Sequence, residues 1–303
     1  MIRKGLGMST AKRQHYVPRC LLKHFCADGQ TINVTDLKTN KTYQTNITNV
    51  AQENRFYDFK TMNGDISLED SFSGLEAKTA PIIDRIVSTE SIAWFTDKDF
   101  QILEDFIVCQ FYRTRKTVNF VKRVLLSDNI PLFDHFNAKG EKVKTIYTND
   151  IDIDDNVSRI MAYNVLHHME HNDVVRDAIA SMEWVLMKAP DDRCFIVSDS
   201  PAVLGSRMSP SEYKGEYAGF ELDDAQIMLP ISSKLMLVLS ARQMVDKKKN
   251  DLLRIMMTGV HVDISDIFKC CVTGGACRCP DRWVTLFNET QKHNAERFIY
   301  GLA

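Results

Sequence analysis

The sequence contains no long apolar run. No stretch approaches the ~20 consecutive apolar residues that a helix needs to cross a bilayer, and the longest ones, such as Leu235 to Leu239, are no longer than a strand. The basic segment at the start of the chain is not followed by the apolar region of a secretory signal. We therefore expect a soluble, cytoplasmic protein with no membrane partner.

A strong charge of one sign is also missing, as are three common enzyme motifs. Lys and Arg total 38 and Asp and Glu total 40, for a formal net charge of -2, so a nucleic-acid partner would have to be bound by a local patch. No Gly-x-x-x-x-Gly-Lys, Gly-x-Gly-x-x-Gly or Gly-x-Ser-x-Gly sequence occurs. P-loop, Rossmann and α/β-hydrolase enzymes are thereby left without their central motif.

What remains is the composition of an ordinary globular protein, with 44% apolar and 26% charged residues. We expect a flexible N-terminus over 1–13 and a single domain over 14–303. Alternating apolar residues predict a hairpin over 31–47, and turn residues predict a short hairpin within a polar excursion at 128–155. Apolar runs rich in β-forming residues predict strands at 184–187, 194–197 and 227–239.

Helical spacing predicts the other half of the fold. A capping box at Ser67 and Asp70 predicts one helix that bends or breaks near Pro81, and a box at Thr96 and Asp99 predicts another that runs to about Leu126. Two more helices are expected at 156–182 and 285–300. The order of these elements indicates an α+β fold, in which a helical layer packs on a mainly antiparallel sheet.

Four short patterns are not explained by periodicity. They are Gln14-His15-Tyr16-Val17-Pro18-Arg19, Val50-Ala51-Gln52-Glu53-Asn54-Arg55-Phe56-Tyr57, Gln110-Phe111-Tyr112-Arg113-Thr114 and Ser198-Asp199-Ser200-Pro201. Together they resemble a mostly bacterial family, the domain of unknown function 4238, over most of the chain. That resemblance implies no defined activity, and the general character of the family suggests a role in bacterial defence or in a mobile element.

The first pattern contains a possible acid–base group and a possible anion ligand. His15 has an ordinary pKa near ~6.5, so it could act as a general base or bind a metal. The planar guanidinium of Arg19 suits a phosphate or a carboxylate. Both residues could equally be structural.

A second set of candidates lies on two predicted helices. Glu69 and Glu76 are seven residues apart, and Gln110 and Arg113 three, so each pair shares a helix face. Antiparallel packing could place Arg113 against Glu76. The pair could line a joint site, or it could form an interhelical salt bridge that locks the helical layer.

Two candidates come from the second half of the chain. Asp199 follows a predicted strand, where a carboxylate often serves as a metal ligand or general base, although it could also organise a turn before Pro201. Asn288 on the last helix could orient a substrate or pack within the fold.

Two potential zinc sites are weaker. His167, Glu170 and His171 show the His-x-x-Glu-His spacing of an inverted zinc-protease motif, but no third ligand follows, and an amphipathic helix with exposed histidines explains the pattern. The spacing of Cys270, Cys271, Cys277 and Cys279 differs from that of ordinary zinc knuckles. We consider zinc there unlikely and expect reduced thiols.

The sequence therefore favours a metal-dependent hydrolase that acts on phosphodiesters, such as a nuclease. In this reading Glu69, Glu76 and Asp199 bind Mg²⁺ or Mn²⁺, with His15, Glu76, Gln110 and Asp199 catalytic. Arg19, Arg113 and Asn288 bind a nucleic acid or a phosphate-containing small molecule. The alternative is a non-catalytic interaction module, in which the same side chains form a structural polar network.

Overall fold

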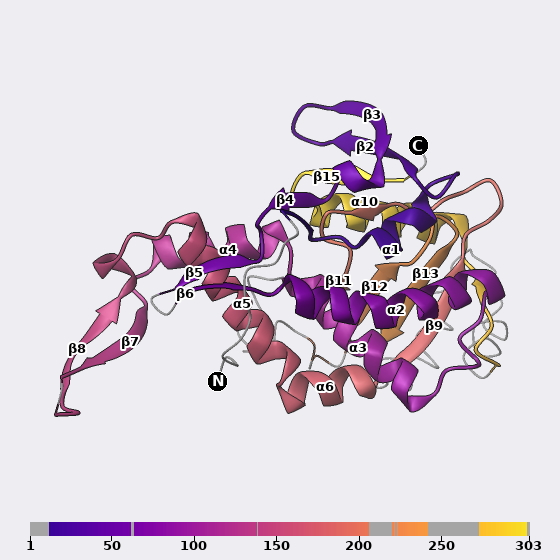
Figure 1. The fold of residues 1–303 in the computed structure, drawn as a ribbon. Coiled ribbons are helices and arrows are strands. Elements are labelled where there is room, and N and C mark those ends of the chain that lie inside the picture. Colours follow the sequence, from indigo (N-terminus) through magenta and orange to yellow (C-terminus); the bar gives the residue numbers. More distant parts are fainter. Residues whose placement is uncertain are drawn as a thin grey trace.

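The computed structural model describes residues 12–61, 64–137, 139–205, 220, 222, 224–241 and 273–301. Residues 1–11 of the expected flexible N-terminus lie outside these ranges. The element order and antiparallel sheets confirm the predicted α+β class (Figure 1).

A five-stranded sheet forms the centre of the molecule. All its neighbouring strands are antiparallel except β9 and β14, which run parallel. In order across the sheet, the strands are β11 (Val203–Gly205), β12 (Gln226–Pro230), β13 (Leu235–Ser240), β9 (Glu183–Lys188) and β14 (Cys277–Arg278).

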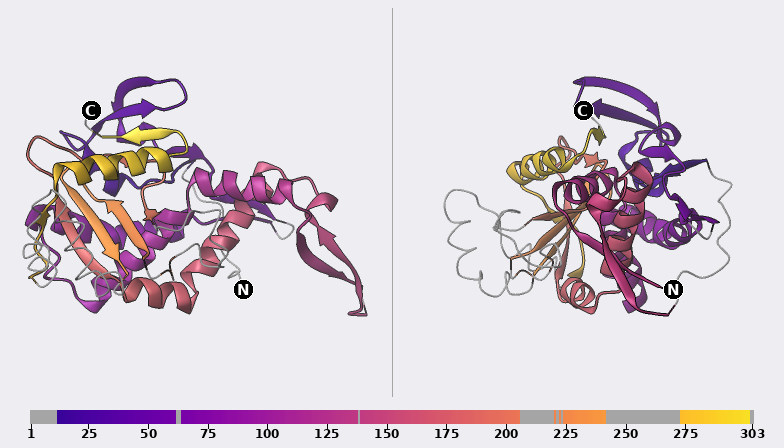
Figure 2. Two further views of the ribbon diagram at one scale, coloured as in Figure 1. Left: turned by 180° about the vertical axis from the view of Figure 1, so that it is seen from behind. Right: turned by 90° about the vertical axis from the view of Figure 1, so that its left-hand side faces the viewer.

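The two faces of this sheet pack against different helices. Leu186 and Leu237 lie in one apolar core with Ile83 and Phe106 of two helices described below, whereas the alternate residues form a second core with the last helix. This alternation follows from the two-residue period of a strand. Seen from behind, the last helix (yellow) crosses in front of the sheet (Figure 2).

A four-stranded antiparallel sheet lies at one end of the molecule. It contains the predicted hairpin of β2 (Thr31–Asp36) and β3 (Lys41–Asn46), and its order is β10–β15–β2–β3. The remaining strands, β10 (Val197–Ser198) and β15 (Phe298–Tyr300), come from the second half of the chain. Strands from both halves of the chain therefore meet in one sheet.

Three two-stranded sheets complete the strand set. They pair β1 (Arg13–His15) with β4 (Gln52–Asn54), β5 (Asp58–Thr61) with β6 (Gly64–Ser67), and β7 (Pro131–Phe136) with β8 (Lys142–Tyr147). The β7–β8 hairpin was expected from the sequence, and it projects away from the rest of the protein (Figure 1).

Seven α-helices are described. They are α1 (Arg19–Leu22), α2 (Glu69–Thr89), α3 (Asp97–Tyr112), α4 (Arg115–Ser127), α5 (Asp155–Glu170), α6 (Asp173–Ala180) and α10 (Asp281–Asn294). Short 3₁₀ turns occupy Lys23–Phe25, Ile47–Asn49 and Thr148–Asp150. Within the described ranges, no helix combines the length and apolarity needed to span a bilayer.

The start of α2 differs from the prediction. Ser67 ends β6 and its hydroxyl donates to Asp58 at 2.6 Å, so it does not form a capping box with Asp70. The helix begins at Glu69 and continues through Pro81 to Thr89, so of the expected bend or break near Pro81 the break is excluded.

Two predicted long helices are each divided. The capping box at Thr96 and Asp99 is confirmed, but α3 ends at Tyr112 and the hydroxyl of Thr114 caps a new helix. The side chain of Asn172 likewise caps α6 after α5 has ended. Thr and Asn are strong N-caps, and within a continuous apolar-periodic segment such a cap marks the start of a new helix. The last predicted helix ends at Asn294, and β15 follows.

Two glycines give a test of local backbone geometry. Gly74 lies in α2 with open space around its Cα, so Gly74→Ala should stabilise the protein by about 0.5–1 kcal/mol. Gly274 has φ +65°, and an added Cβ would lie 2.5 Å from the backbone nitrogen of Ala93. Gly274→Ala should therefore destabilise by about 2 kcal/mol or more. Urea unfolding measures both, and equal effects of the two variants would contradict this geometry.

Candidate functional site

Two of the unexplained sequence patterns pair directly with each other. In the β1–β4 ladder, Gln14 lies opposite Glu53 and His15 opposite Gln52. Pro18 then forms the N-cap of α1, so that Arg19 is the first residue of this helix. The pairing brings the 14–19 pattern against the 50–57 pattern at the edge of the helical layer.

Gln14 is fully buried and fixes this pairing. Its side-chain amide donates to Asp58 at 2.8 Å, and its side-chain oxygen accepts the backbone N–H of Tyr57 at 2.6 Å. Asp58 also accepts hydrogen bonds from Ser67 and Arg55. Gln14 therefore has a structural role beside the candidate site.

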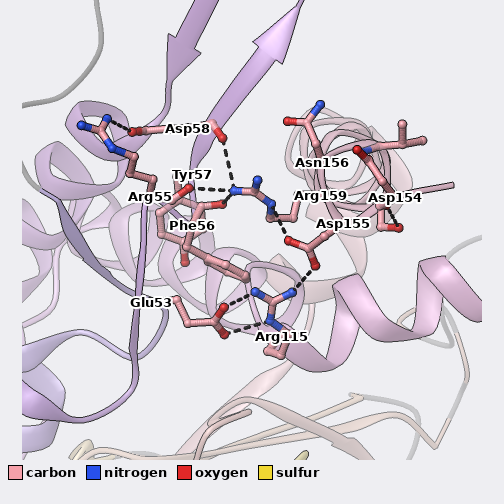
Figure 3. A network of polar contacts seen from close by, with 12 residues as sticks. Glu53, Arg55, Phe56, Tyr57, Asp58, Arg115, Asp154, Asp155, Asn156 and Arg159 are labelled. Carbon is pink, nitrogen blue, oxygen red and sulfur yellow. Dashed lines mark hydrogen bonds and ion pairs between the residues drawn. The ribbon is translucent and has the colours of Figure 1, made fainter. Parts of the chain in front are cut away.

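A ladder of alternating charges braces the same region from the other side (Figure 3). Arg115 binds both carboxylate oxygens of Glu53 and also contacts Asp155 at 2.7 Å. Asp155 in turn contacts Arg159 at 3.1 Å. One nitrogen of Arg159 donates to the backbone carbonyls of Arg55, Phe56 and Asp58. Sequence reasoning missed this ladder, which joins β4, α4 and α5.

The predicted contact between Glu76 and Arg113 is confirmed. Nη2 of Arg113 lies 2.8 Å from Oε1 of Glu76, and the Arg113 side chain is 1% exposed against 27% for Glu76. The carbonyl of Arg113 accepts a hydrogen bond from the Tyr57 hydroxyl at 3.0 Å. Arg113 is thus held between α2 and the 50–57 segment, with Glu76 exposing part of its carboxylate.

His15 lies in the field of this ion pair and of Arg19. Burial, together with the positive charge of Arg19, lowers the pKa of His15 to about 4, whereas Glu76 acts in the opposite direction. Nε2 of the ring is buried and has no hydrogen-bond partner in the part of the chain that the structure describes. At neutral pH His15 is therefore an uncharged imidazole with a free nitrogen.

Glu69 is the second carboxylate of this region. Burial, reinforced by the negative charge of Glu76, raises the pKa of Glu69 to about 7. Arg113 opposes that shift, so Glu69 responds to both members of the ion pair. We call His15, Arg19, Glu69, Glu76 and Arg113 the His15 cluster. Arg19 is its exposed cation.

Gln110 lies on α3 near this cluster and is fully buried. The remaining two candidates are elsewhere. The carboxylate of Asp199 accepts the backbone N–H groups of Glu296, Arg297 and Phe298, each at 2.8 Å. Asn288 bridges the carbonyl of Cys194 and the N–H of Ile196. Glu76 is thus near enough to Glu69 to raise its pKa, whereas Asp199 is held by the backbone that precedes and begins β15.

The His167–His171 motif forms no metal site in the part of the chain that the structure describes, and half of the cysteine cluster lies outside that part. His167 and His171 are exposed and their rings stack at 4.4 Å. Cys277 and Cys279 are buried, and burial raises the pKa of Cys279 to about 12, while Cys270 and Cys271 lie outside the described residues. Among the residues described, no group of three or more His, Cys, Asp or Glu side chains is placed to hold a metal ion.

Comparison with known proteins places the chain in a family. Residues 13–302 match the family described as "Protein of unknown function (DUF4238)", and the chain belongs to it. Neither the characterised proteins nor the solved structures include a match. The four sequence patterns thus lie within one family domain, whose shared description assigns no activity.

The ion pair of the His15 cluster gives the first prediction for the site. Glu76→Gln leaves the buried guanidinium of Arg113 without its carboxylate, and we expect a loss of about 2–3 kcal/mol in the free energy of unfolding. The matched control is Glu289→Gln, whose partner Lys292 is exposed, and it should cost less than about 0.5 kcal/mol. Similar losses in both variants would show that Glu76 does not compensate a buried charge.

Removal of the Glu69 charge is expected to stabilise the folded state at high pH, whereas removal of the Glu76 charge is expected to destabilise it. Its raised pKa means that the folded state binds this proton more tightly than the unfolded state, so stability is lost as pH rises from about 4.5 to about 7. Above pH 7, in EDTA, Glu69→Gln should therefore be more stable than the wild type, while near pH 4.5 the two should be equal. The control is its neighbour Asp70, which is exposed in the first turn of α2. Asp70→Asn should lose about 0.3–1 kcal/mol by weakening the helix-dipole interaction. A destabilised Glu69→Gln at high pH would overturn the prediction.

Proposed function

We propose that this family member is a metal-assisted hydrolase of phosphodiesters and that the His15 cluster is its active centre. One observation carries the proposal: the neutral His15, whose buried Nε2 has no partner among the described residues, lies in the electrostatic field of the exposed Arg19 and of the partly exposed Glu76. Glu76 acts in turn on a second partly exposed carboxylate, Glu69. A structural network has no need of an unsatisfied ring nitrogen, because an unmade buried hydrogen bond costs about 1–3 kcal/mol. Groups that destabilise a fold are characteristic of functional sites.

The two carboxylates fit a magnesium or manganese ion. Mg²⁺ commonly uses one or two carboxylates and completes its shell with water and substrate phosphate, and Glu69 and Glu76 provide such a pair. Once bound, the ion would supply Lewis-acid activation of water and of the phosphoryl group. Asp199 already holds the turn before β15 and is assigned a structural role in this proposal.

The other three residues of the His15 cluster would have separate roles in the reaction. Arg19 is exposed and presents a planar fork to a phosphate. Arg113 is buried and fixes the Glu76 carboxylate. His15 is uncharged at neutral pH, and its buried Nε2 would accept a proton from the attacking water once substrate binding brings that water within hydrogen-bond reach of the ring.

The competing function is a non-catalytic interaction module. The charge ladder of Glu53, Arg115, Asp155 and Arg159 favours it, because this network serves to connect backbone segments (Figure 3). In that case the His15 cluster would be a continuation of the ladder, and removal of its charges would affect stability alone.

Hydrolysis of DNA, RNA and bis(p-nitrophenyl) phosphate by the purified chain tests the proposal in Mg²⁺, Mn²⁺ or EDTA. We expect metal-dependent cleavage that falls by about 10²–10⁴-fold in His15→Gln and is lost in Glu69→Gln, which remains folded. Arg19→Ala should raise KM more than it lowers kcat, since it acts through substrate binding. Glu289→Gln is the control and should keep full activity. Absence of cleavage with every substrate, or full activity in Glu69→Gln, would support the interaction module instead.

A further inference from the structure

The two faces of the β1–β4 ladder differ in how their polar side chains are satisfied. Residues opposite each other in an antiparallel pair project to the same face. On one face Gln14 is held by the hydrogen bonds described above, and Glu53 is held by Arg115. On the other face are His15 and Gln52, and each has a buried polar atom without a hydrogen-bond partner among the described residues. These atoms are Nε2 of His15 and the side-chain oxygen Oε1 of Gln52.

The backbone ladder places these two side chains close to each other. The N–H of Tyr16 donates to the carbonyl of Ala51 at 2.9 Å, so these residues form a hydrogen-bonded pair. Hydrogen-bonded and non-hydrogen-bonded pairs alternate along an antiparallel ladder, which makes the next pair, His15 and Gln52, non-hydrogen-bonded. In such pairs the Cα atoms lie roughly 4.5 Å apart and the side chains approach most closely. The two unpartnered atoms therefore belong to adjacent side chains on one face.

The hydrogen bonding of the His15 ring makes Nε2 an acceptor. Burial lowers the pKa of His15, but a hydrogen bond to the backbone of Ile47 acts in the opposite direction, so the ring is the donor in that bond. Since Nε2 has no partner, the donating nitrogen is Nδ1, and Nε2 of the uncharged ring carries no proton. The amide oxygen of Gln52 is also an acceptor only. Two acceptors cannot bond to each other, so a third group that donates two hydrogens is needed to satisfy both.

We infer that Gln52 positions the attacking water of the hydrolysis, a role that rests on the proposed function. Water donates two O–H groups, one for Nε2 of His15 and one for Oε1 of Gln52. A water held in this way has both hydrogens directed at the protein, so its oxygen lone pairs are left to face the phosphorus atom. His15 and Gln52 are each partly exposed although the two acceptor atoms are buried, so these atoms lie just below the surface. Gln52 is absent from the candidates that helix-face spacing and strand ends predicted.

The roles of the two acceptors differ during the reaction. The water oxygen would form the new P–O bond as the bond from phosphorus to the leaving oxygen breaks. One water proton would pass to Nε2 of His15, which later returns it to solvent, and the leaving oxygen would take a proton from solvent. The second water hydrogen would stay on the product, hydrogen-bonded to Oε1 of Gln52 until release. Gln52 thus neither gains nor loses a proton.

The shared site of His15 and Gln52 can be tested without substrate or metal. Gln52→Glu places a negative charge beside the imidazole, so it should raise the pKa of His15 above its value of about 4 by at least about 1. The titration of the His15 ring by NMR in EDTA measures this change. The matched control is Gln101→Glu at an exposed position near the start of α3, which should leave the pKa of His15 unchanged. An unchanged pKa in Gln52→Glu would overturn the inference, whatever the hydrolysis assays give.

Kinetics with bis(p-nitrophenyl) phosphate test the role of Gln52 in the reaction. Gln52→Met keeps the length of the side chain but removes the amide oxygen, so kcat should fall by about tenfold or more while KM changes by less than about twofold. Gln52→Glu keeps an acceptor oxygen and should retain kcat at high pH, but the acidic limb of its pH profile should move to higher pH. A purely structural role would not produce this contrast. If Gln52→Met does not fold, the pH profile of Gln52→Glu decides, and an unmoved acidic limb contradicts the assignment.

The outcomes separate failure of this inference from failure of the proposed function. An active wild type with full kcat in a folded Gln52→Met would overturn the role of Gln52 and leave the metal-assisted hydrolase standing. A wild type that hydrolyses none of the substrates would contradict the proposed function, and the role of Gln52 would fail with it. Loss of kcat in Gln52→Met with unchanged kcat in Gln101→Met would support both.

Discussion

The arrangement of the N-terminal half depends on the placement of Arg115 and Arg159 between acidic partners. A single nitrogen of Arg159 donates to three backbone carbonyls in the 55–58 segment, and Asp155 links Arg159 to Arg115. Without these contacts, buried carbonyls would lack donors, which is costly away from water. The ladder fixes the segment that carries Tyr57, and the Tyr57 hydroxyl in turn positions the end of α3 and hence Arg113.

The charged residues of the ladder differ in their energetic role from those of the His15 cluster. The residues of the ladder satisfy one another, and their function is complete within the fold. In the His15 cluster Glu76 and Arg113 form such a pair, but burial keeps the imidazole of His15 neutral, and burial together with the charge of Glu76 favours the protonated form of Glu69. The ion pairs lower the free energy of the folded state, whereas the burial of His15 and Glu69 raises it. A fold that keeps both has used the rigid ladder to hold strained groups in place.

Much of this could be read from the sequence. Strand alternation predicted the β2–β3 and β7–β8 hairpins, and helix-face spacing predicted the contact between Glu76 and Arg113. The predicted helix boundaries were wrong where Thr114 and Asn172 interrupt continuous apolar patterns. A helix cap depends on one side chain, whereas the apolar periodicity is an average over many residues and does not detect it. The position of Asp199 could not be derived either. Its three backbone partners lie almost a hundred residues further along the chain, and only the β10–β15 pairing brings them close.

The position of β15 also bears on the timing of folding during synthesis. This strand lies between β10 and β2, so the hairpin of residues 31–46 cannot join its sheet until the ribosome has passed residue 300. Arg297 makes the same connection to Asp36 across 261 residues. Contacts of such separation close slowly because the intervening chain must first lose its freedom. The N-terminal hairpin is therefore synthesised early but joins its sheet late. For most of translation it must remain soluble without β15 beside it.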